Sequence, residues 1–85
     1  MRIRIRYHGP YRNDSGRDEE TLRLAGSASV GDVMDELRSK YGNAFIERKD
    51  GLVCLMEEGS PKAAALEDPL YEGALLLFVG TVESG

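Results

Sequence analysis

The sequence predicts an α+β fold in which a mixed sheet of four to five strands carries one main helix across one face. Three observations lead to this prediction. Residues 2–7 alternate strictly between charged and apolar side chains, which indicates a half-buried strand. Residues 30–41 carry apolar side chains at helical spacing, which indicates one amphipathic helix. Residues 74–79 are apolar at every position, a pattern typical of a central strand covered on both sides.

Length and composition limit the chain to one small domain. It has 85 residues, of which 41% are hydrophobic, enough for one compact core. The net charge of −4 disfavours nucleic acid as the main partner. The longest apolar run is too short to cross a membrane, and the Arg-Ile alternation at the start is not a signal peptide. The single Cys54 cannot form an internal disulfide, so we expect a cytoplasmic protein in which Cys54 is a small buried hydrophobe.

Two strands are predicted before the helix, in residues 2–7 and 19–24. In the first strand the inward side chains are Ile3, Ile5 and Tyr7, and the outward ones are Arg2, Arg4 and Arg6. In the second strand Leu22 and Leu24 point inward. Residues 8–18 contain Gly-Pro and Asn-Asp-Ser-Gly and little that is apolar, so we expect a loop that closes a hairpin. The arginines should then form a solvated basic strip with Arg23 opposite and Glu19 as an offsetting charge.

The helix has clear start and stop signals. Ser29 is a good N-cap, and Asp32 three residues later can complete a capping box. Gly42 follows the last apolar residue and is expected to end the helix. The apolar stripe consists of Val30, Val33, Met34, Leu37 and Tyr41. This stripe must lie on the sheet, because nothing else in the chain could cover it.

The second half of the chain is predicted from shorter signals. Residues 43–50 look irregular, with Phe45 and Ile46 as apolar plugs, and Gly51 opens a strand over residues 52–56. Residues 57–61 and 68–73 are expected to be turns. Residues 63–66 fit a short strand or a helical turn equally well.

The order of elements predicts the β-grasp architecture of ubiquitin-like proteins, with the last strand inserted beside the first. Here the chain resembles the family of ubiquitin-like sulfur carriers, and most closely the small subunit of molybdopterin synthase. The likeness covers nearly the whole length and rests on residues 1–7, 29–42, 66–73 and 76–85. It implies a β-grasp domain over residues 1–80 and a C-terminal tail over residues 81–85.

Two departures from the family pattern stand out before the end of the chain. Residues 66–73 resemble the family's turn into the last strand, although Ala74 stands where an acidic residue is usual. Gly80 and Thr81 replace a pair that is often Pro-Pro in the molybdopterin branch.

The resemblance implies that Gly85 is the reacting residue. Its carboxylate would attack the α-phosphate of ATP on an E1-like adenylyltransferase, and a sulfur donor would then displace AMP to leave a C-terminal thiocarboxylate. The large subunit of molybdopterin synthase, or an equivalent acceptor, would receive the sulfur. The chain would therefore not be an enzyme itself and would bind neither a cofactor nor a metal. This agrees with the lack of a Ser/His/Asp set, a Cys/His cluster or a phosphate-binding glycine motif in the sequence.

The same resemblance assigns roles to the residues before Gly85. Gly80, Thr81, Val82, Glu83 and Ser84 would thread into the partner's active site. Ser84 stands where the family has Gly, which adds a Cβ and a hydroxyl in a narrow channel. Phe78 and Val79 are adjacent in the last strand and must point to opposite faces. One belongs to the core and the other, with Val82, could form an apolar docking surface.

Other functions remain open at this point. The chain could be a ubiquitin-like modifier joined to lysine through Gly85, a sulfur carrier for thiazole synthesis, or a β-grasp interaction module without tail chemistry. The natural chain could also be longer and need trimming before Gly85 is exposed.

Overall fold

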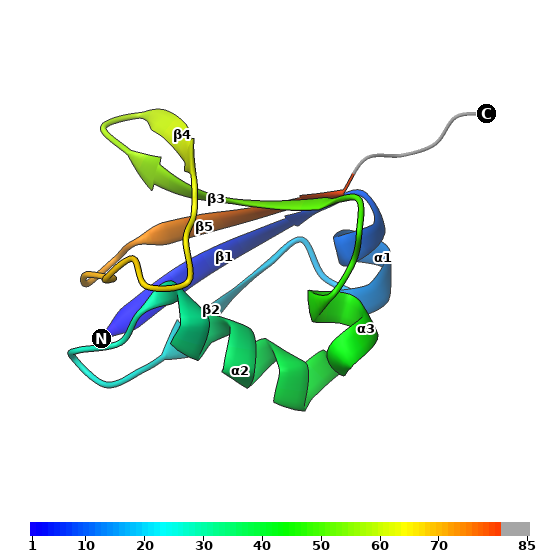
Figure 1. Cartoon of the computed structure of the whole chain (residues 1–85), viewed down its shortest axis with the longest axis horizontal. Helices are drawn as coiled ribbons and strands as arrows, with labels where there is room; N and C mark the ends of the chain where they lie inside the picture. The colour runs from blue at the N-terminus through cyan, green and yellow to red at the C-terminus, as the bar shows by residue number, and fades with distance from the viewer. Residues whose placement is uncertain (81–85) are drawn as a thin grey trace.

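The structure, a computed structural model, describes residues 1–80, so the predicted tail over residues 81–85 lies outside the described part. One five-stranded sheet carries the helices (Figure 1). The elements in chain order are β1 (Arg2–His8), α1 (Pro10–Ser15), β2 (Glu19–Arg23), α2 (Val30–Tyr41), α3 (Asn43–Ile46), β3 (Gly51–Glu57), β4 (Ser60–Ala63) and β5 (Leu75–Gly80). This is the predicted α+β, β-grasp arrangement.

The sheet order is β2-β1-β5-β3-β4, so β5 is central as predicted. β1 and β2 pair antiparallel, with Ile3 opposite Leu22, which confirms the hairpin. β5 runs parallel to β1 on one side and antiparallel to β3 on the other. β5 therefore joins the β1–β2 hairpin to the β3–β4 hairpin in one sheet, and it is apolar on both faces.

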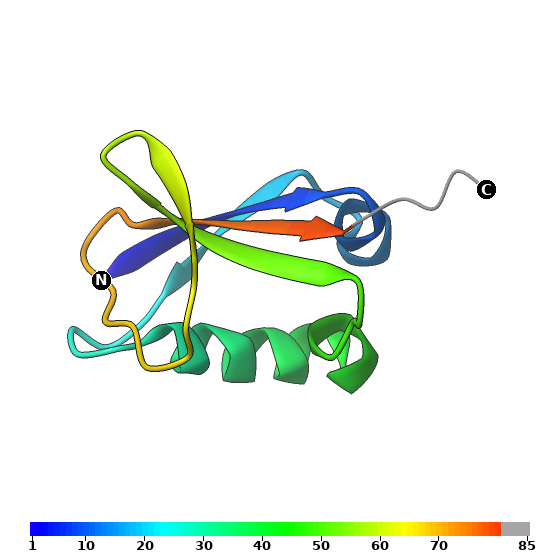
Figure 2. The ribbon, with the colours of Figure 1, turned by 45° about the horizontal axis from the view of Figure 1, so that its top comes forward.

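α2 forms as its sequence predicts. The Ser29 side chain and the Asp32 side chain complete the capping box, and the Ser29 amide donates to Asp32 Oδ2 at 2.8 Å. The amide of Gly42 donates to the carbonyl of Arg38 at 2.8 Å and closes the last turn. Figure 2 shows α2 lying along one face of the sheet, while no helix of residues 1–80 lies along β1, β5 and β3 on the opposite face. The buried positions of α2 are Val30, Val33 and Leu37, and Met34 and Tyr41 pack beside them.

The predicted loop over residues 8–18 was wrong in part, because it contains α1. Pro10 fits the first turn of a helix, where its missing N–H has no partner to lose. Gly9 and Gly16 take positive φ values of 62° and 76° at the two ends, which suits residues without a Cβ. Tyr11 is only 2% exposed, so this single apolar residue anchors α1 to the core.

The segment predicted as irregular between α2 and β3 contains the one-turn helix α3. Phe45 on this turn is 3% exposed and plugs the core, as expected, whereas Ile46 is only partly buried. Gly51 opens β3, and Cys54 within it is buried, which confirms its assignment as a small hydrophobe.

The β3–β4 hairpin corrects the prediction for residues 57–66. Glu58 and Gly59 alone form the turn, with φ values of 51° and 82° that match the left-handed conformations of a two-residue hairpin loop. The short strand therefore begins at Ser60 rather than at residue 63. Pro61 lies within this strand and is tolerated because β4 is at the edge of the sheet, where a missing donor breaks no ladder.

The core lies between α2 and the inner face of the sheet, and one end of it is aromatic. Tyr7, Tyr11, Tyr41, Phe45 and Phe78 form a cluster of mostly edge-to-face contacts with centroids 4.7–6.5 Å apart. This cluster lies where β5 approaches its last residue. The end of the central strand is therefore supported by large, closely packed side chains.

Candidate functional site: the outer face of the sheet and the end of β5

The outer face of the sheet, which we define as the face opposite α2, contains one of the two predicted docking residues. Phe78 is 1% exposed and belongs to the core, whereas Val79 points to the outer face and is half-buried. Val79 is therefore the member of the pair that a partner can contact. The other predicted site residues, Thr81, Val82, Glu83, Ser84 and Gly85, lie outside the described residues.

Cross-strand pairing builds an apolar half of this outer face. Val79 pairs with Leu52 of β3, and Leu77 pairs with Cys54. Paired residues of neighbouring strands point to the same side of a sheet, so these side chains form a continuous surface. Leu52, near the start of β3, is 52% exposed and is one of the exposed large hydrophobic residues of the described part of the chain. The apolar outer patch consists of Leu52, Cys54, Leu75, Leu77 and Val79.

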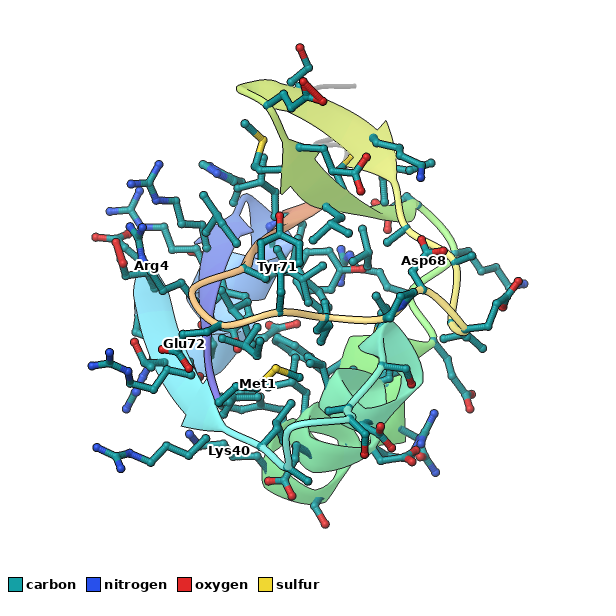
Figure 3. The ribbon with its side chains drawn as sticks, turned by 90° about the vertical axis from the view of Figure 1, so that its left-hand side faces the viewer. Met1, Arg4, Lys40, Asp68, Tyr71 and Glu72 are labelled. Atoms are coloured by element: carbon teal, nitrogen blue, oxygen red, sulfur yellow. The ribbon has the colours of Figure 1, made fainter. Side chains whose placement is uncertain are left out.

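The other half of the outer face is basic, as the sequence predicts. Arg4 and Arg6 of β1 both approach the carboxylate of Glu19, at 3.6 Å and 3.7 Å. Arg2 pairs through Nε with Glu72 at 3.0 Å, and the backbone amide of Arg2 donates to the same carboxylate. Figure 3 shows Arg4 projecting from the sheet on the side away from α2, with Glu72 on the turn before β5. These pairs are exposed, so they contribute little to stability and leave the arginines accessible.

The register joins the two halves into one surface. Arg4 pairs with Leu75, and Arg6 pairs with Leu77 across the parallel β1–β5 ladder. The apolar outer patch therefore borders the arginines directly. Such a surface fits a partner that presents an apolar area flanked by carboxylates.

Gly80 is the last residue of β5 and is buried. A Cβ built on it would lie 2.8 Å from Cδ of Pro10 and 3.4 Å from Nε of Arg48. The first distance is shorter than van der Waals contact allows, so this position has no room for a side chain. The residue from which the chain continues toward Gly85 is thus enclosed by α1 and by the loop after α3.

A polar network in the core was not predicted. Glu20 of β2 is 6% exposed and accepts hydrogen bonds from the hydroxyls of Tyr7, at 3.0 Å, and Tyr41. Lys40 Nζ pairs with its other oxygen. Burial by itself would raise the pKa of Glu20, but the donors of Lys40, Tyr41 and Tyr7 outweigh it and hold the pKa below its usual value. The pKa of Tyr7 is raised well above its usual range by burial and by this carboxylate. Both effects favour an ionised Glu20 that links β2 to α2.

Within residues 1–80 no three His, Cys, Asp or Glu side chains gather closely enough to hold a metal ion. Over the same residues, no helix is both long and apolar enough to span a membrane.

Sequence reasoning missed several residues of this site. Leu52 and Leu77 were predicted only as strand residues and Cys54 only as a buried hydrophobe. Period-two alternation in both strands could have placed them with Val79 once the register was known. Nothing in the sequence indicates that Pro10 and Arg48 lie near Gly80, because only the tertiary fold brings their segments to the end of β5.

Comparison with known proteins gives matches at the level of structure. No family model matches the sequence, and no curated protein matches it significantly. Among solved structures, a protein assigned as molybdopterin converting factor subunit 1 from Pyrococcus furiosus has a TM-score of 0.79 and 20% identity over 96% of this chain and 99% of its own. SAMP1 from Haloferax volcanii has a TM-score of 0.74 and 19% identity over 100% of both chains. A complex of subunits 1 and 2 of the molybdopterin-converting factor from Helicobacter pylori contains a chain with a TM-score of 0.67 and 16% identity over 100% of both chains.

These similarities establish the fold. Identities of 16–20% show a shared architecture over the full length of the chain and do not by themselves carry a function from one protein to another. The chain has the ubiquitin-like β-grasp fold that is also seen in molybdopterin-converting-factor and small archaeal modifier structures.

Proposed function

We propose that this chain is a sulfur carrier. In this proposal an E1-like adenylyltransferase uses ATP to activate the carboxylate of Gly85, and a sulfur donor converts the acyl-adenylate to a thiocarboxylate. The chain then donates this sulfur to the large subunit of a molybdopterin-type synthase or to an equivalent acceptor. It is acted upon by its partners and needs no catalytic side chain of its own.

One observation carries the proposal. The central strand β5 presents Leu75, Leu77 and Val79 on an outer face without a covering helix, and Gly85 follows this strand by only five residues. A partner that docks on the apolar outer patch would therefore hold the strand that leads directly to the reacting residue. Burial of such a patch provides affinity, and the neighbouring arginines provide orientation.

The chemical step is balanced by what the partners supply. The Gly85 carboxylate displaces pyrophosphate from ATP and forms a mixed anhydride with AMP. Hydrosulfide supplied by the sulfur donor then attacks the carbonyl carbon, AMP leaves with the bonding electron pair, and the thiocarboxylate remains. Activation is required because a carboxylate is a poor electrophile, whereas AMP is a good leaving group from the mixed anhydride.

Several structural neighbours support this class of function. The complex from Helicobacter pylori joins subunit 1 to subunit 2 of its molybdopterin-converting factor, so a protein of this fold assembles with a second subunit there. We propose an equivalent partner for the present chain, namely the acceptor that receives its sulfur.

A second candidate is a protein modifier. Two of the neighbours, from Haloferax volcanii and Methanosarcina acetivorans, are small archaeal modifier proteins with TM-scores of 0.73 and 0.69. In this case the activated Gly85 would form an isopeptide bond with a lysine of a target protein. The fold and the outer face suit either fate, because both begin with adenylation.

One experiment separates the two fates. The tagged chain is incubated with ATP, an E1-like adenylyltransferase and extract from its own cells, and its products are resolved by mass. A thiocarboxylate without conjugates supports the carrier, whereas higher-mass lysine conjugates that require Gly85 support the modifier. Neither product, with an adenylyltransferase that activates a control ending in Gly-Gly, would contradict both and favour an interaction module. The Ser84→Gly variant is the matched control, since it restores the family's penultimate residue.

A further inference from the structure

We propose that Gly80 and Pro10 are positioning residues that fix the point from which the chain continues toward Gly85. With Gly51, Tyr11 and Arg48 they form what we call the strand-end collar. This inference rests on the proposed activation of Gly85 and adds a requirement to it. The collar makes the end of β5 a rigid base, so that a docked partner receives the reacting residue in a defined place.

The collar is built on a pair of glycines. Gly80 of β5 lies opposite Gly51 of β3 in the antiparallel register. A Cβ on Gly80 would lie 2.8 Å from Cδ and 3.2 Å from Cγ of Pro10, and a Cβ on Gly51 would lie 1.8 Å from the hydroxyl of Tyr11. The last pair of this ladder therefore has no side chain on either strand, and two consecutive residues of α1 occupy the space.

α1 is held firmly in that position. Tyr11 is 2% exposed, and its ring packs edge-on against Phe45 at 5.2 Å and Phe78 at 5.4 Å between centroids. Because these rings belong to the core, Pro10 cannot move away from Gly80 without disturbing them. The contact between Pro10 and Gly80 is therefore fixed from the side of α1.

Arg48 closes the collar from the loop after α3. Its guanidinium lies 5.9 Å from the centre of the Tyr11 ring. It also approaches Asp50 at 2.9 Å and Asp14 of α1 at 3.8 Å. Three segments that are distant in sequence thus meet around Gly80.

Packing against Pro10 requires glycine at this position, but it does not explain why α1 is placed so close to the end of β5. Glycine within a strand lowers stability and contributes no side chain to the core. If β5 only had to end here, a larger residue could occupy the position and α1 could lie further from it. A defined base is useful, in contrast, where a reacting group five residues further on must reach a fixed point, because a misplacement of about 1 Å can reduce a rate by about 100-fold.

The test compares two Gly→Ala variants. Gly80→Ala adds a methyl group against Pro10, whereas Gly26→Ala adds the same group where nothing lies within 4 Å, at a residue without a positive φ. Each chain is used as the substrate of an E1-like adenylyltransferase that activates the wild-type chain, and ATP–pyrophosphate exchange gives kcat and KM. Melting temperatures are measured in parallel, and the assay is run well below the lowest of them.

We expect Gly80→Ala to lower kcat by about tenfold or more while KM for the chain stays within about twofold, because the outer face is unchanged. Gly26→Ala should match the wild type. Pro10→Ala removes Cγ and Cδ, so the double variant Pro10→Ala/Gly80→Ala should recover most of kcat. Because the assay is run well below every melting temperature, a loss of stability alone would leave kcat unchanged.

Three results would overturn the inference. The first is a Gly80→Ala chain with the kcat of the wild type, and the second is a loss that the Pro10→Ala change does not relieve. The third is a change confined to KM, which would assign Gly80 to docking. A wild-type chain that no adenylyltransferase activates would instead contradict the proposed function, and this inference would fall with it.

Discussion

The inner and outer faces of β5 have nearly the same composition but different surroundings. Leu76 and Phe78 on the inner face are 0% and 1% exposed beneath α2. Leu75, Leu77 and Val79 on the outer face are only half-buried, although they lie at the centre of a five-stranded sheet. The inner residues are needed for folding, whereas the outer ones leave apolar area that stability alone does not require. This difference assigns folding to the inner face and, under the proposed function, partner recognition to the outer face.

The largest expected effect comes from a matched pair of leucines. Leu76→Ala should lower the free energy of unfolding by about 2–5 kcal/mol, since it opens a cavity in the core. Leu77→Ala removes the same atoms from the half-buried outer face and should cost about 1 kcal/mol. Urea denaturation of both variants measures the difference. Equal losses would mean that the two faces do not differ as described.

A comparable loss is expected on the helix that covers the inner face. Leu37 is 0% exposed, and Leu37→Ala should cost about 2–5 kcal/mol in the same denaturation experiment. The neighbouring Glu36 is exposed, and Glu36→Ala serves as the control with an expected change within about 0.5 kcal/mol. A Leu37→Ala loss well under 1 kcal/mol would contradict the placement of α2 over the sheet.

The outer face should respond in binding rather than in stability. Val79→Glu places a charge in the apolar outer patch and should weaken binding to an adenylyltransferase by about tenfold or more. Leu66→Glu is the control, because it changes a leucine that is 61% exposed but does not belong to the apolar outer patch. Leu66 lies beside Gly31 of α2 instead. Calorimetric titration gives both affinities. If the two variants bind equally well, the outer patch is not the docking surface.

The Glu20 network predicts a smaller, pH-dependent effect on the inner side. The pKa of Glu20 is lower in the folded chain than its ordinary value of 4.5, so ionised Glu20 stabilises the fold above that value. This stabilisation should disappear as the pH falls through the lowered folded pKa. Glu20→Gln should lower the free energy of unfolding by about 1–3 kcal/mol at neutral pH. The variant should also lose less of its free energy of unfolding than the wild type as the pH falls. Denaturation curves from neutral pH down to acid test this, and an unchanged slope for the variant would refute it.

The smallest effect is expected at the end of the chain. Deletion of Ser84 and Gly85 should leave the melting temperature nearly unchanged, because terminal residues seldom contribute to a core. The same deletion should abolish adenylation. Calorimetry measures the melting temperature, and pyrophosphate exchange measures adenylation on the same preparation. If both decreased in the deletion variant, these residues would have a stabilising role, contrary to the prediction.

The sequence predicted the elements whose patterns are local. Alternation identified β1 and β2, the Ser29–Asp32 capping box identified the start of α2, and the continuous apolar run identified β5 as central. It also predicted the basic strip and its offset by Glu19. Each of these features depends on residues that are close in sequence or on the two-residue period of a strand.

What the sequence did not predict depends on tertiary contacts. α1 was taken for a loop because Gly, Pro and Asn usually mark turns, and only the burial of Tyr11 in the core stabilises a helix there. The period that turns Leu22 inward also turns Glu20 inward, but two of its three partners, Lys40 and Tyr41, come from the far end of α2. Pro10 meets Gly80 only once β5 has been inserted beside β1.

The central claim is that Gly85, following the central strand, is an activated sulfur carrier terminus. Intact mass spectrometry of the purified chain, after incubation with ATP, an E1-like adenylyltransferase and a sulfide source, tests it most directly. The account predicts a gain equal to the replacement of one oxygen by sulfur, which requires ATP and is absent when Gly85 is deleted. An unchanged mass, with the same enzyme active on a control that ends in Gly-Gly, would contradict it.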